Sequence, residues 1–244
     1  MKDSGMPASY IVRFAKRRPQ LTDGWETPAW QQAGTADLLV FRPEGSDHKP
    51  MTRARLLYDN AGLYCMFMVM DKFVRSVQTE FMGPVCTDSC VEFFVRPKPD
   101  RGYFNIEINC GGTLLCHYIT NPVRTPVGFQ GSTPLTLEDG RMIHIHHSMP
   151  LTVEPEIVTP TTWTIAYHVP FALLEKYVGP IGAVAGQQWT GNFYKCGDKT
   201  SHPHWVSWNS VDALNFHLPQ CFGTLAFAAP DVSRHDIRTS KTLV

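Results

Sequence analysis

An alternation of apolar and polar residues between positions 87 and 109 is the strongest pattern in the chain. The runs 90–95 and 103–109 place a hydrophobic side chain at every second position, and the turn-forming sequence PKPDRG separates them. A period of two with β-branched and aromatic residues is typical of strands, so the pattern predicts a hairpin with one apolar face. The other face carries Glu92, Asn105, Glu107 and Asn109. A face of carboxylates and amides suits sugar hydroxyls, and it suits solvent equally well.

The strand pattern recurs along most of the chain. Residues 53–71 predict a second hairpin around the turn Asp59–Gly62. Shorter strands are expected at 10–14 (an edge strand), 38–41, 113–118, 142–148, 163–169, 189–196 and 223–227, and loops at 73–87, 121–134 and 201–222. The segment Phe171–Tyr177 has a helical pattern of about two turns. With 19 prolines and 18 glycines, the sequence predicts an all-β fold, an antiparallel β-sandwich with one short helix.

The 244 residues are interpreted as one sandwich domain with two extensions. Single all-β domains often reach this size, and no repeat or low-complexity segment divides the chain. We expect an N-terminal lead-in at residues 1–20, the sandwich at 21–228 and a C-terminal tail at 229–244.

Composition and charge exclude several classes of function. The 22 basic and 22 acidic residues balance, so we expect no strong field that would hold nucleic acid or an anionic membrane. No apolar run reaches the roughly 18 residues of a membrane span. The N-terminus lacks a signal-peptide pattern, which indicates a cytoplasmic protein or an exported one whose leader has been removed. Seven cysteines without CxxC spacing favour reduced, buried thiols over a disulfide framework.

Glu92 and Glu107 lie on the same face of two paired strands. Two carboxyl groups in a cleft could act as general acid and base in glycoside hydrolysis, which requires a separation of roughly 5–10 Å. The alternative is that both are solvated or bonded to neighbouring groups. The sequence contains no G-x-S-x-G motif, P-loop or dinucleotide-binding fingerprint.

Two sets of residues could in principle hold a metal. One His-x-His pair on a predicted strand, His144 and His146, could be completed by His202 and His204 from a later loop. Zinc needs three or four converging ligands, so surface or core histidines are the preferred interpretation. Oxygen ligands for calcium could come from Asp59, Asp71, Asp88 and Asp198, which lack the spacing of a calcium loop. We therefore assign no metal ligand and no cofactor, and leave structural calcium open.

A region rich in aromatic residues offers a candidate sugar site. Trp205, Trp208 and Phe216 lie within a dozen residues, and Asn192 and Tyr194 precede them on a predicted strand. Sugar rings stack on aromatic rings through their C–H faces, while their hydroxyls need paired donors and acceptors. The alternative is that the tryptophans fill the core. Because they are three residues apart, they would lie on opposite faces of an extended segment.

Several segments, in this order, resemble the family 9 carbohydrate-binding modules and their standalone relatives. The resemblance spans about residues 20–228. It begins with Asp23, Gly24 and Trp30 and continues with RLLYDNAGLYCMFMVMD, DSCVEFFVRP, GYFNIEINCGGTLL, WTIAYHVPF, NFYKCGD, HWVSWNS and FHLPQCFGTLAF. It implies a β-sandwich of the jelly-roll type that binds sugars and catalyses nothing.

The resemblance also implies a grip on the reducing end of a glycan between two aromatic rings. Glu92 matches a carboxylate that bonds sugar, and Phe216 matches one ring. The other ring is expected where Val85 and Cys86 stand, and Phe81 is the nearest aromatic residue. The expected ligand-binding residues are Glu92, Asn105, Glu107, Asn192, Tyr194, Trp205, Trp208 and Phe216.

The sequence thus favours non-catalytic carbohydrate binding, linked to polysaccharide breakdown. The expected partner is a carbohydrate, with no nucleic acid and no membrane span. One alternative is a glycoside hydrolase that uses Glu92 and Glu107. Another is a sandwich that binds a protein partner, which the missing ring of the aromatic grip would favour.

Overall fold

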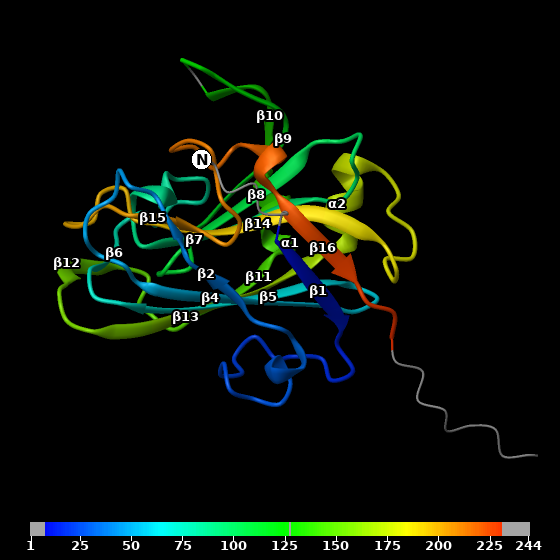
Figure 1. Ribbon diagram of the computed structural model, residues 1–244, viewed down its shortest axis with the longest axis horizontal. Coiled ribbons are helices and arrows are strands. Elements are labelled where there is room, and N and C mark those ends of the chain that lie inside the picture. The colour runs from blue at the N-terminus through cyan, green and yellow to red at the C-terminus, as the bar shows by residue number, and fades with distance from the viewer. Residues whose placement is uncertain (1–7, 127, 231–244) are drawn as a thin grey trace, which may run out of the picture.

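Strands with one apolar face bury that face against a second sheet, and this chain folds in that way. The computed structural model describes residues 8–126 and 128–230. Two layers of strands pack against each other (Figure 1). The predicted β-sandwich is therefore confirmed. The first seven residues of the predicted lead-in and residues 231–244 of the predicted tail lie outside the described part of the chain.

The first layer carries the strongest sequence pattern at its centre. Its strands, in order across the sheet, are β10 (Gly128–Pro134), β9 (Leu114–Thr125), β8 (Tyr103–Asn109), β7 (Cys90–Arg96), β14 (Gln188–Cys196) and β16 (Gly223–Phe227). The short strands β15 (Trp205–Ser207) and β3 (Val40–Phe41) pair with each other, and β15 also pairs with β14. These pairs are antiparallel.

The second layer contains the other predicted hairpin. Its strands are β2 (Ala36–Leu38), β4 (Met51–Tyr58), β5 (Gly62–Asp71), β13 (Thr161–Pro170) and β11 (His144–His147). A separate two-stranded sheet pairs β6 (Val74–Ser76) with β12 (Val153–Ile157).

The helical segments are α1 (Leu137–Met142), α2 (Phe171–Val178) and the 3₁₀ turns η1 (Trp30–Gln32), η2 (Val85–Thr87) and η3 (Pro219–Cys221).

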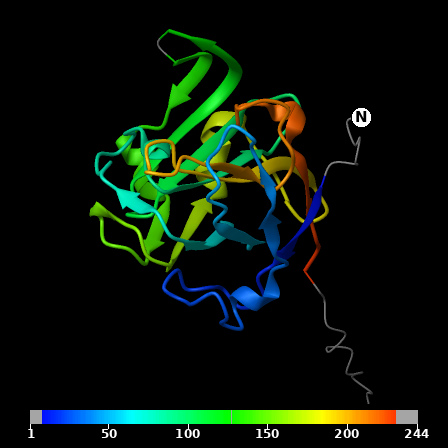
Figure 2. The same ribbon diagram turned by 60° about the vertical axis from the view of Figure 1, so that its left-hand side comes forward.

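The strand β1 (Ser9–Phe14) joins the two layers. Its first part runs parallel to β16 and its last two residues run parallel to β4 (Figures 1 and 2). The segment was predicted as an edge strand. Residues 9–12 pair only with β16 and residues 13–14 only with β4, so the segment borders each layer in turn and also connects them. The sandwich is also not wholly antiparallel, because both pairings of β1 are parallel.

Most other departures from the predicted elements lie outside the core. Residues 121–134, expected as a loop, form much of the β9–β10 hairpin, whose polar and exposed residues lack the alternation of a buried strand. The loops expected at 73–87 and 201–222 contain β6 with η2 and β15 with η3. The predicted helix is confirmed as α2. The short helix α1 was not predicted; Thr136 caps it by accepting a hydrogen bond from the Asp139 N–H at 3.1 Å.

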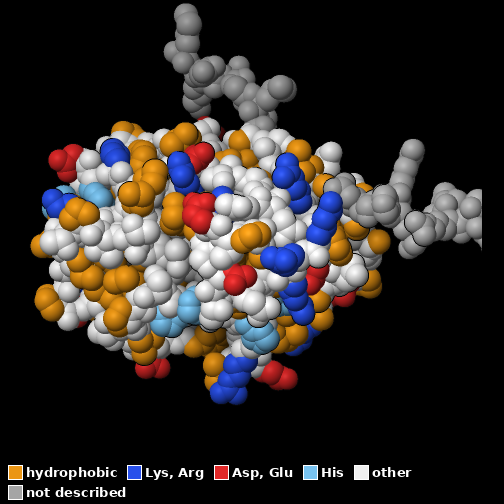
Figure 3. Space-filling model, turned by 90° about the horizontal axis from the view of Figure 1, so that it is seen from below, with side chains coloured by type: hydrophobic (Ala, Val, Ile, Leu, Met, Phe, Trp, Pro, Cys, Tyr) orange, Lys and Arg blue, Asp and Glu red, His pale blue; other side chains and the backbone are white. Residues whose placement is uncertain are grey.

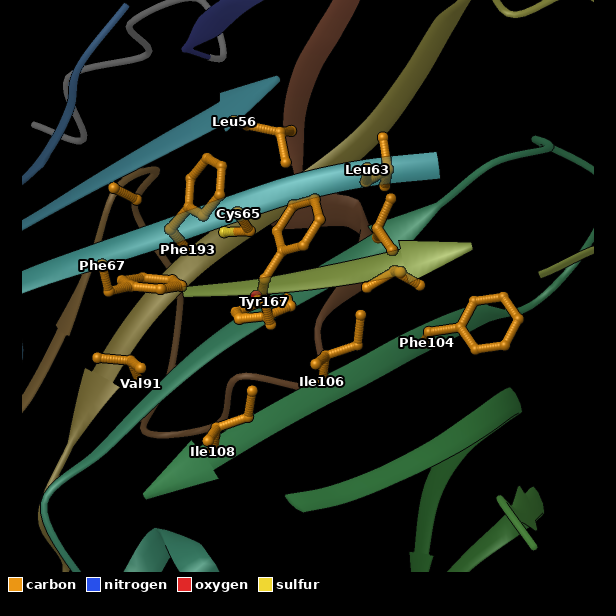
Figure 4. Close-up of a cluster of buried hydrophobic side chains, with 14 of the residues drawn as sticks. Leu56, Leu63, Cys65, Phe67, Val91, Phe104, Ile106, Ile108, Tyr167 and Phe193 are labelled. Carbon is orange, nitrogen blue, oxygen red and sulfur yellow. The ribbon is translucent and has the colours of Figure 1, made fainter. Parts of the chain in front are cut away.

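The core lies between the layers and contains the apolar faces that the alternation predicts. Figure 4 shows side chains of β7 and β8 facing those of the second layer, among them Val91, Ile106, Phe67 and Tyr167. All of these are buried. None of the seven cysteines forms a disulfide in the described chain, and six are buried, so the predicted burial is confirmed for these six.

Charged groups of both signs are interspersed on the face drawn in Figure 3. This distribution agrees with the balanced composition of 22 basic and 22 acidic residues. In residues 8–126 and 128–230, neither α-helix has the length and hydrophobicity needed to cross a bilayer.

A buried ion pair connects the two layers at one end of the core. Lys195 on β14 is fully buried, and its Nζ lies 3.4 Å from Oδ2 of Asp71, the last residue of β5. Nζ also bonds His204 Nε2 at 2.7 Å, and His48 Nε2 bonds Asp71 Oδ1 at 2.7 Å. Burial raises the pKa of Asp71, but the Lys195 charge and the His48 hydrogen bond outweigh it and hold that pKa well below its ordinary value.

We expect Asp71→Asn to lower the free energy of unfolding by about 3–5 kcal/mol, because it leaves the Lys195 charge buried without an anion. Lys195→Met should cost a similar amount. The double variant should cost less than the sum, since it removes both charges together. Urea unfolding of the four proteins measures this coupling. Additive effects would show that the two charges do not stabilise each other.

Candidate functional site

A pocket of about 300 Å³ opens on the first layer, on the side away from the core. Strands β7, β8 and β14 form its floor, and the chain from 205 to 217 forms an aromatic wall. Its lining residues are Cys86, Glu92, Glu107, Arg124, Cys196, Asp198, Trp205, Leu214, Asn215, Phe216 and His217. The volume is at the lower end of the range for small-molecule sites, roughly 300–1,000 Å³.

The polar face of the β7–β8 hairpin is this floor, and it is not open to solvent. Glu92 and Glu107 are 3% and 6% exposed, and Asn105 and Asn109 are buried as well. The interpretation of this face as a solvated surface is therefore wrong. Part of the chain between 205 and 222, which the sequence predicted as a loop, packs over the face with Phe216 and Phe222.

The strand register places the two glutamates side by side. Glu92 on β7 pairs directly with Glu107 on β8, so both carboxyl groups enter the pocket from neighbouring strands. Burial and the nearby Glu107 raise the pKa of Glu92 well above its ordinary value. Burial and the nearby Asp198 raise the pKa of Glu107 to about 7, against the lowering effect of an Asn105 hydrogen bond. Both groups therefore hold a proton more readily than a solvated carboxyl would.

The pocket carboxyls have little positive charge near them. In the described chain, none of the ion pairs involves Glu92, Glu107 or Asp198. Arg124, near the end of β9, is the only lysine or arginine that lines the pocket within the described residues. Instead, Glu92 Oε1 accepts a hydrogen bond from the Cys196 thiol at 3.1 Å, and Trp205 Nε1 donates to Asp198 Oδ1 at 2.7 Å.

Two of the predicted site residues support the lining without contributing to it. Asn105 donates to Glu107 Oε1 at 2.7 Å and accepts from the His117 backbone N–H at 2.6 Å, so its amide is fixed between two partners. Tyr194 lies beneath Phe216, with their rings stacked 4.1 Å apart, and its hydroxyl donates to the Phe216 carbonyl. Both therefore orient a residue that faces the pocket.

Asn192 and Trp208 belong to the framework, outside the pocket lining. Asn192 is fully buried and ties β14 to Asn209, donating to its carbonyl and accepting from its N–H, each at 2.9 Å. Trp208 packs edge-on against Tyr10 and Phe193 of the core. Thus four of the eight predicted residues line the pocket: Glu92, Glu107, Trp205 and Phe216.

The second ring of the aromatic grip is not supplied by Phe81. That side chain packs on the core beside Gly140, and Val85 is buried; of the expected segment only Cys86 lines the pocket. Trp205 and His217 are the ring-bearing residues that line the pocket together with Phe216. The grip predicted from the resemblance is therefore altered in this chain.

Sequence reasoning missed Arg124 and His217 as site residues. Arg124 lies over the Phe129 ring, on a hairpin that was expected to be an irregular loop. His217 Nδ1 shares a hydrogen bond of 2.9 Å with the Tyr103 hydroxyl, and burial lowers its pKa to about 3. Since His217 is neutral near pH 7, it can offer its other ring nitrogen to a ligand. Contacts between segments far apart in the sequence bring these residues together, among them the ring contact of His217 with Phe129.

The metal ligand sets considered from sequence do not assemble. Within the described chain, neither His144 nor His146 belongs to a group of three converging potential ligands, and no three carboxylates converge. Asp59 bonds Arg18 and Tyr64, and Asp88 bonds backbone N–H groups of the loop after β6. The four aspartates considered for calcium thus serve separate local roles.

Comparison with known proteins identifies the family of this chain. The sequence model of Carbohydrate-binding family 9 matches residues 30–227, which is most of the chain. The chain belongs to this family. No curated protein is significantly similar to it in sequence.

Solved structures with the same fold include carbohydrate-binding proteins. A proposed carbohydrate-binding protein from Bacteroides uniformis ATCC 8492 is 27% identical, with a TM-score of 0.73 over 91% of this chain and 99% of that one. Two structures of a family 9 module from Caldicellulosiruptor kristjanssonii are each 12% identical. The complex with cellotriose has a TM-score of 0.61 over 97% and 98% of the two chains, and the complex with glucose has 0.62 over 93% and 100%. At 12% identity, these two show that the fold is shared.

The raised pKa of Glu107 predicts a specific pH dependence of stability for this family 9 protein. The folded state keeps a proton that the unfolded state loses, so stability falls as the pH rises from about 4.3 to the folded pKa near 7. Glu107→Gln retains the bond with Asn105 and removes the titration. In urea unfolding at pH 5 and pH 8, the wild type should lose roughly 2–3 kcal/mol more than the variant. Equal losses would contradict the raised pKa.

Proposed function

We propose that this protein binds a sugar, or one end of an oligosaccharide, in the pocket on the first layer, without catalysing a reaction on it. The observation that carries the proposal is the combination of aromatic rings and buried hydrogen-bonding groups around one small cavity. Phe216 and Trp205 offer faces for a sugar ring, and Glu92 and Glu107 lie at the floor. A pocket of about 300 Å³ suits the end of a glycan better than a long chain laid across a surface.

The protonation of the floor suits an uncharged, hydroxyl-rich ligand. A protonated carboxyl both donates and accepts hydrogen bonds, as a hydroxyl group does. Because the pKa of both glutamates is raised, a neutral sugar can pair with them without leaving two buried negative charges side by side. Asn215 and His217 add hydrogen-bonding groups to the lining.

The solved relatives supply the first ligands to test. The module from Caldicellulosiruptor kristjanssonii was solved with glucose and with cellotriose. We infer a preference for a glucose-containing oligosaccharide, held by its reducing end, in a role linked to polysaccharide breakdown. The altered aromatic grip favours modest affinity, since fewer ring faces contact the sugar.

A binding role is favoured over glycoside hydrolysis by the placement of the two carboxyls. Glu92 and Glu107 pair directly on neighbouring strands, so both rise from the same floor of the pocket, whereas a hydrolase needs carboxyls that flank the scissile bond. A site for a protein partner is less well supported, because the aromatic and polar groups line a pocket and not a broad apolar surface.

Isothermal titration calorimetry with glucose and cello-oligosaccharides tests the site. Phe216→Ala and Glu92→Ala should each weaken binding at least about tenfold, or about 1.4 kcal/mol, through loss of ring contact and of a hydroxyl partner. Met70→Ala is the matched control, because Met70 is half exposed on the second layer. Affinity that survives both pocket substitutions would place the sugar elsewhere.

The same sugars and chromogenic glycosides test for hydrolysis. We expect no product above the buffer rate over long incubation. Turnover that Glu92→Gln and Glu107→Gln both abolish would establish an enzyme and overturn the non-catalytic proposal.

A further inference from the structure

Two groups of potential metal ligands occur in the described part of the chain, and they differ in charge. His48, Asp71 and His204 form the first. The Lys195 ammonium already lies within this group, 3.4 Å from Asp71 Oδ2 and 2.7 Å from His204 Nε2. A second cation there would be repelled by the lysine, so this group is explained by the ion pair between the layers.

The second group contains Cys90, Glu92 and Cys196, whose ligand atoms all lie within 4.8 Å of one another. The strand register builds it: Cys90 on β7 pairs directly with Cys196 on β14, and Glu92 follows on the same face of β7. The Cys196 thiol donates to Glu92 Oε1 at 3.1 Å. Two sulfur atoms and one carboxylate are thus held by two neighbouring strands at the floor of the pocket.

This second group has no cation of its own. Glu107 and Asp198 add two further carboxyls to the same pocket, and within residues 8–126 and 128–230 none of the three acidic residues forms an ion pair. Unlike the first group, this one contains no lysine, and Arg124 is the only lysine or arginine that lines the pocket in the described chain. A divalent cation here therefore does not meet the repulsion that excludes it from the first group.

We propose that Cys90, Cys196 and Glu92 form a binding site for a thiophilic divalent cation of the zinc type at the floor of the pocket. Two thiolates and one carboxylate are a ligand set that zinc accepts, and sulfur ligands disfavour magnesium and calcium. Glu92 and Cys196 line the pocket, which gives the ion a route of entry. Three protein ligands leave a fourth position for water.

The metal site does not depend on sugar binding, because its ligands are complete without a sugar. The test therefore uses the metal alone. Purified protein, kept reduced with a phosphine, is titrated with Co²⁺, whose bonds to thiolates give charge-transfer absorption in the near ultraviolet. We expect this band to saturate at one Co²⁺ per chain and to disappear on addition of Zn²⁺, which binds such sites more tightly.

Three variants assign the band to this site. Cys90→Ser and Cys196→Ser should each weaken binding at least about tenfold, and their double variant should lose the band. Cys65→Ser is the matched control, because Cys65 is a buried thiol on β5 in the other layer, and it should bind as the wild type does. Glu92→Gln keeps both thiols, so it should weaken binding while the band persists at saturation.

Two results of the titration would contradict a metal site at these cysteines. No thiolate band in the wild type, or a band that survives the double variant, would overturn the proposal. If the cysteine variants unfold, the thermal shift that Zn²⁺ induces in the wild type and in Glu92→Gln decides, since a ligand of the folded state raises its stability. Equal shifts in these two proteins would also overturn it.

Discussion

The alternation of side chains along β7 and β8 couples the core to the pocket. Val91 and Ile106 point into the sandwich, while Glu92 and Glu107 point away from it on the same two strands. A slip of one residue in register would exchange these faces and place two carboxyls in the core. Burial of the apolar face therefore fixes which acidic groups meet at the pocket floor, and the hydrogen bonds between β7 and β8 set them side by side.

The alternation along β14 has a similar effect, because its consecutive residues Lys195 and Cys196 face opposite sides of the sheet. Lys195 faces the core and is neutralised by Asp71 of the other layer. Cys196 faces the pocket, where its neighbour Glu92 has no ion-pair partner in the described chain. A satisfied buried charge stabilises the arrangement of the layers, whereas an unsatisfied group raises the free energy of the empty pocket. Ligands that supply the missing partner gain from that difference.

The sequence predicts the elements that depend on local alternation. The hairpins predicted at 53–71 and 87–109, the sandwich and the placement of Glu92 and Glu107 on one face follow from period-two patterns and turn residues, whereas the direct pairing of the two glutamates comes from the strand register. The sequence does not predict that β1 connects the two layers, because parallel pairing with two strands distant in the sequence leaves no local pattern. Trp205 and Trp208 are indistinguishable by composition; only the paired register of β15 with β14 settles which one lines the pocket.

The pocket residues that sequence reasoning missed share a physical feature: they become neighbours only through long-range contacts. Arg124 arrives on a polar hairpin, and Cys196 is brought beside Cys90 by pairing across 106 residues of chain. Cysteine spacing along the chain carries no trace of that contact, since a strand pair can join any two segments. The sequence predicts the glutamates of the pocket floor, but it does not predict that Arg124 and Cys196 lie beside them. In a β-sandwich the chemistry of a site thus depends on strand order as much as on the residues of any one strand.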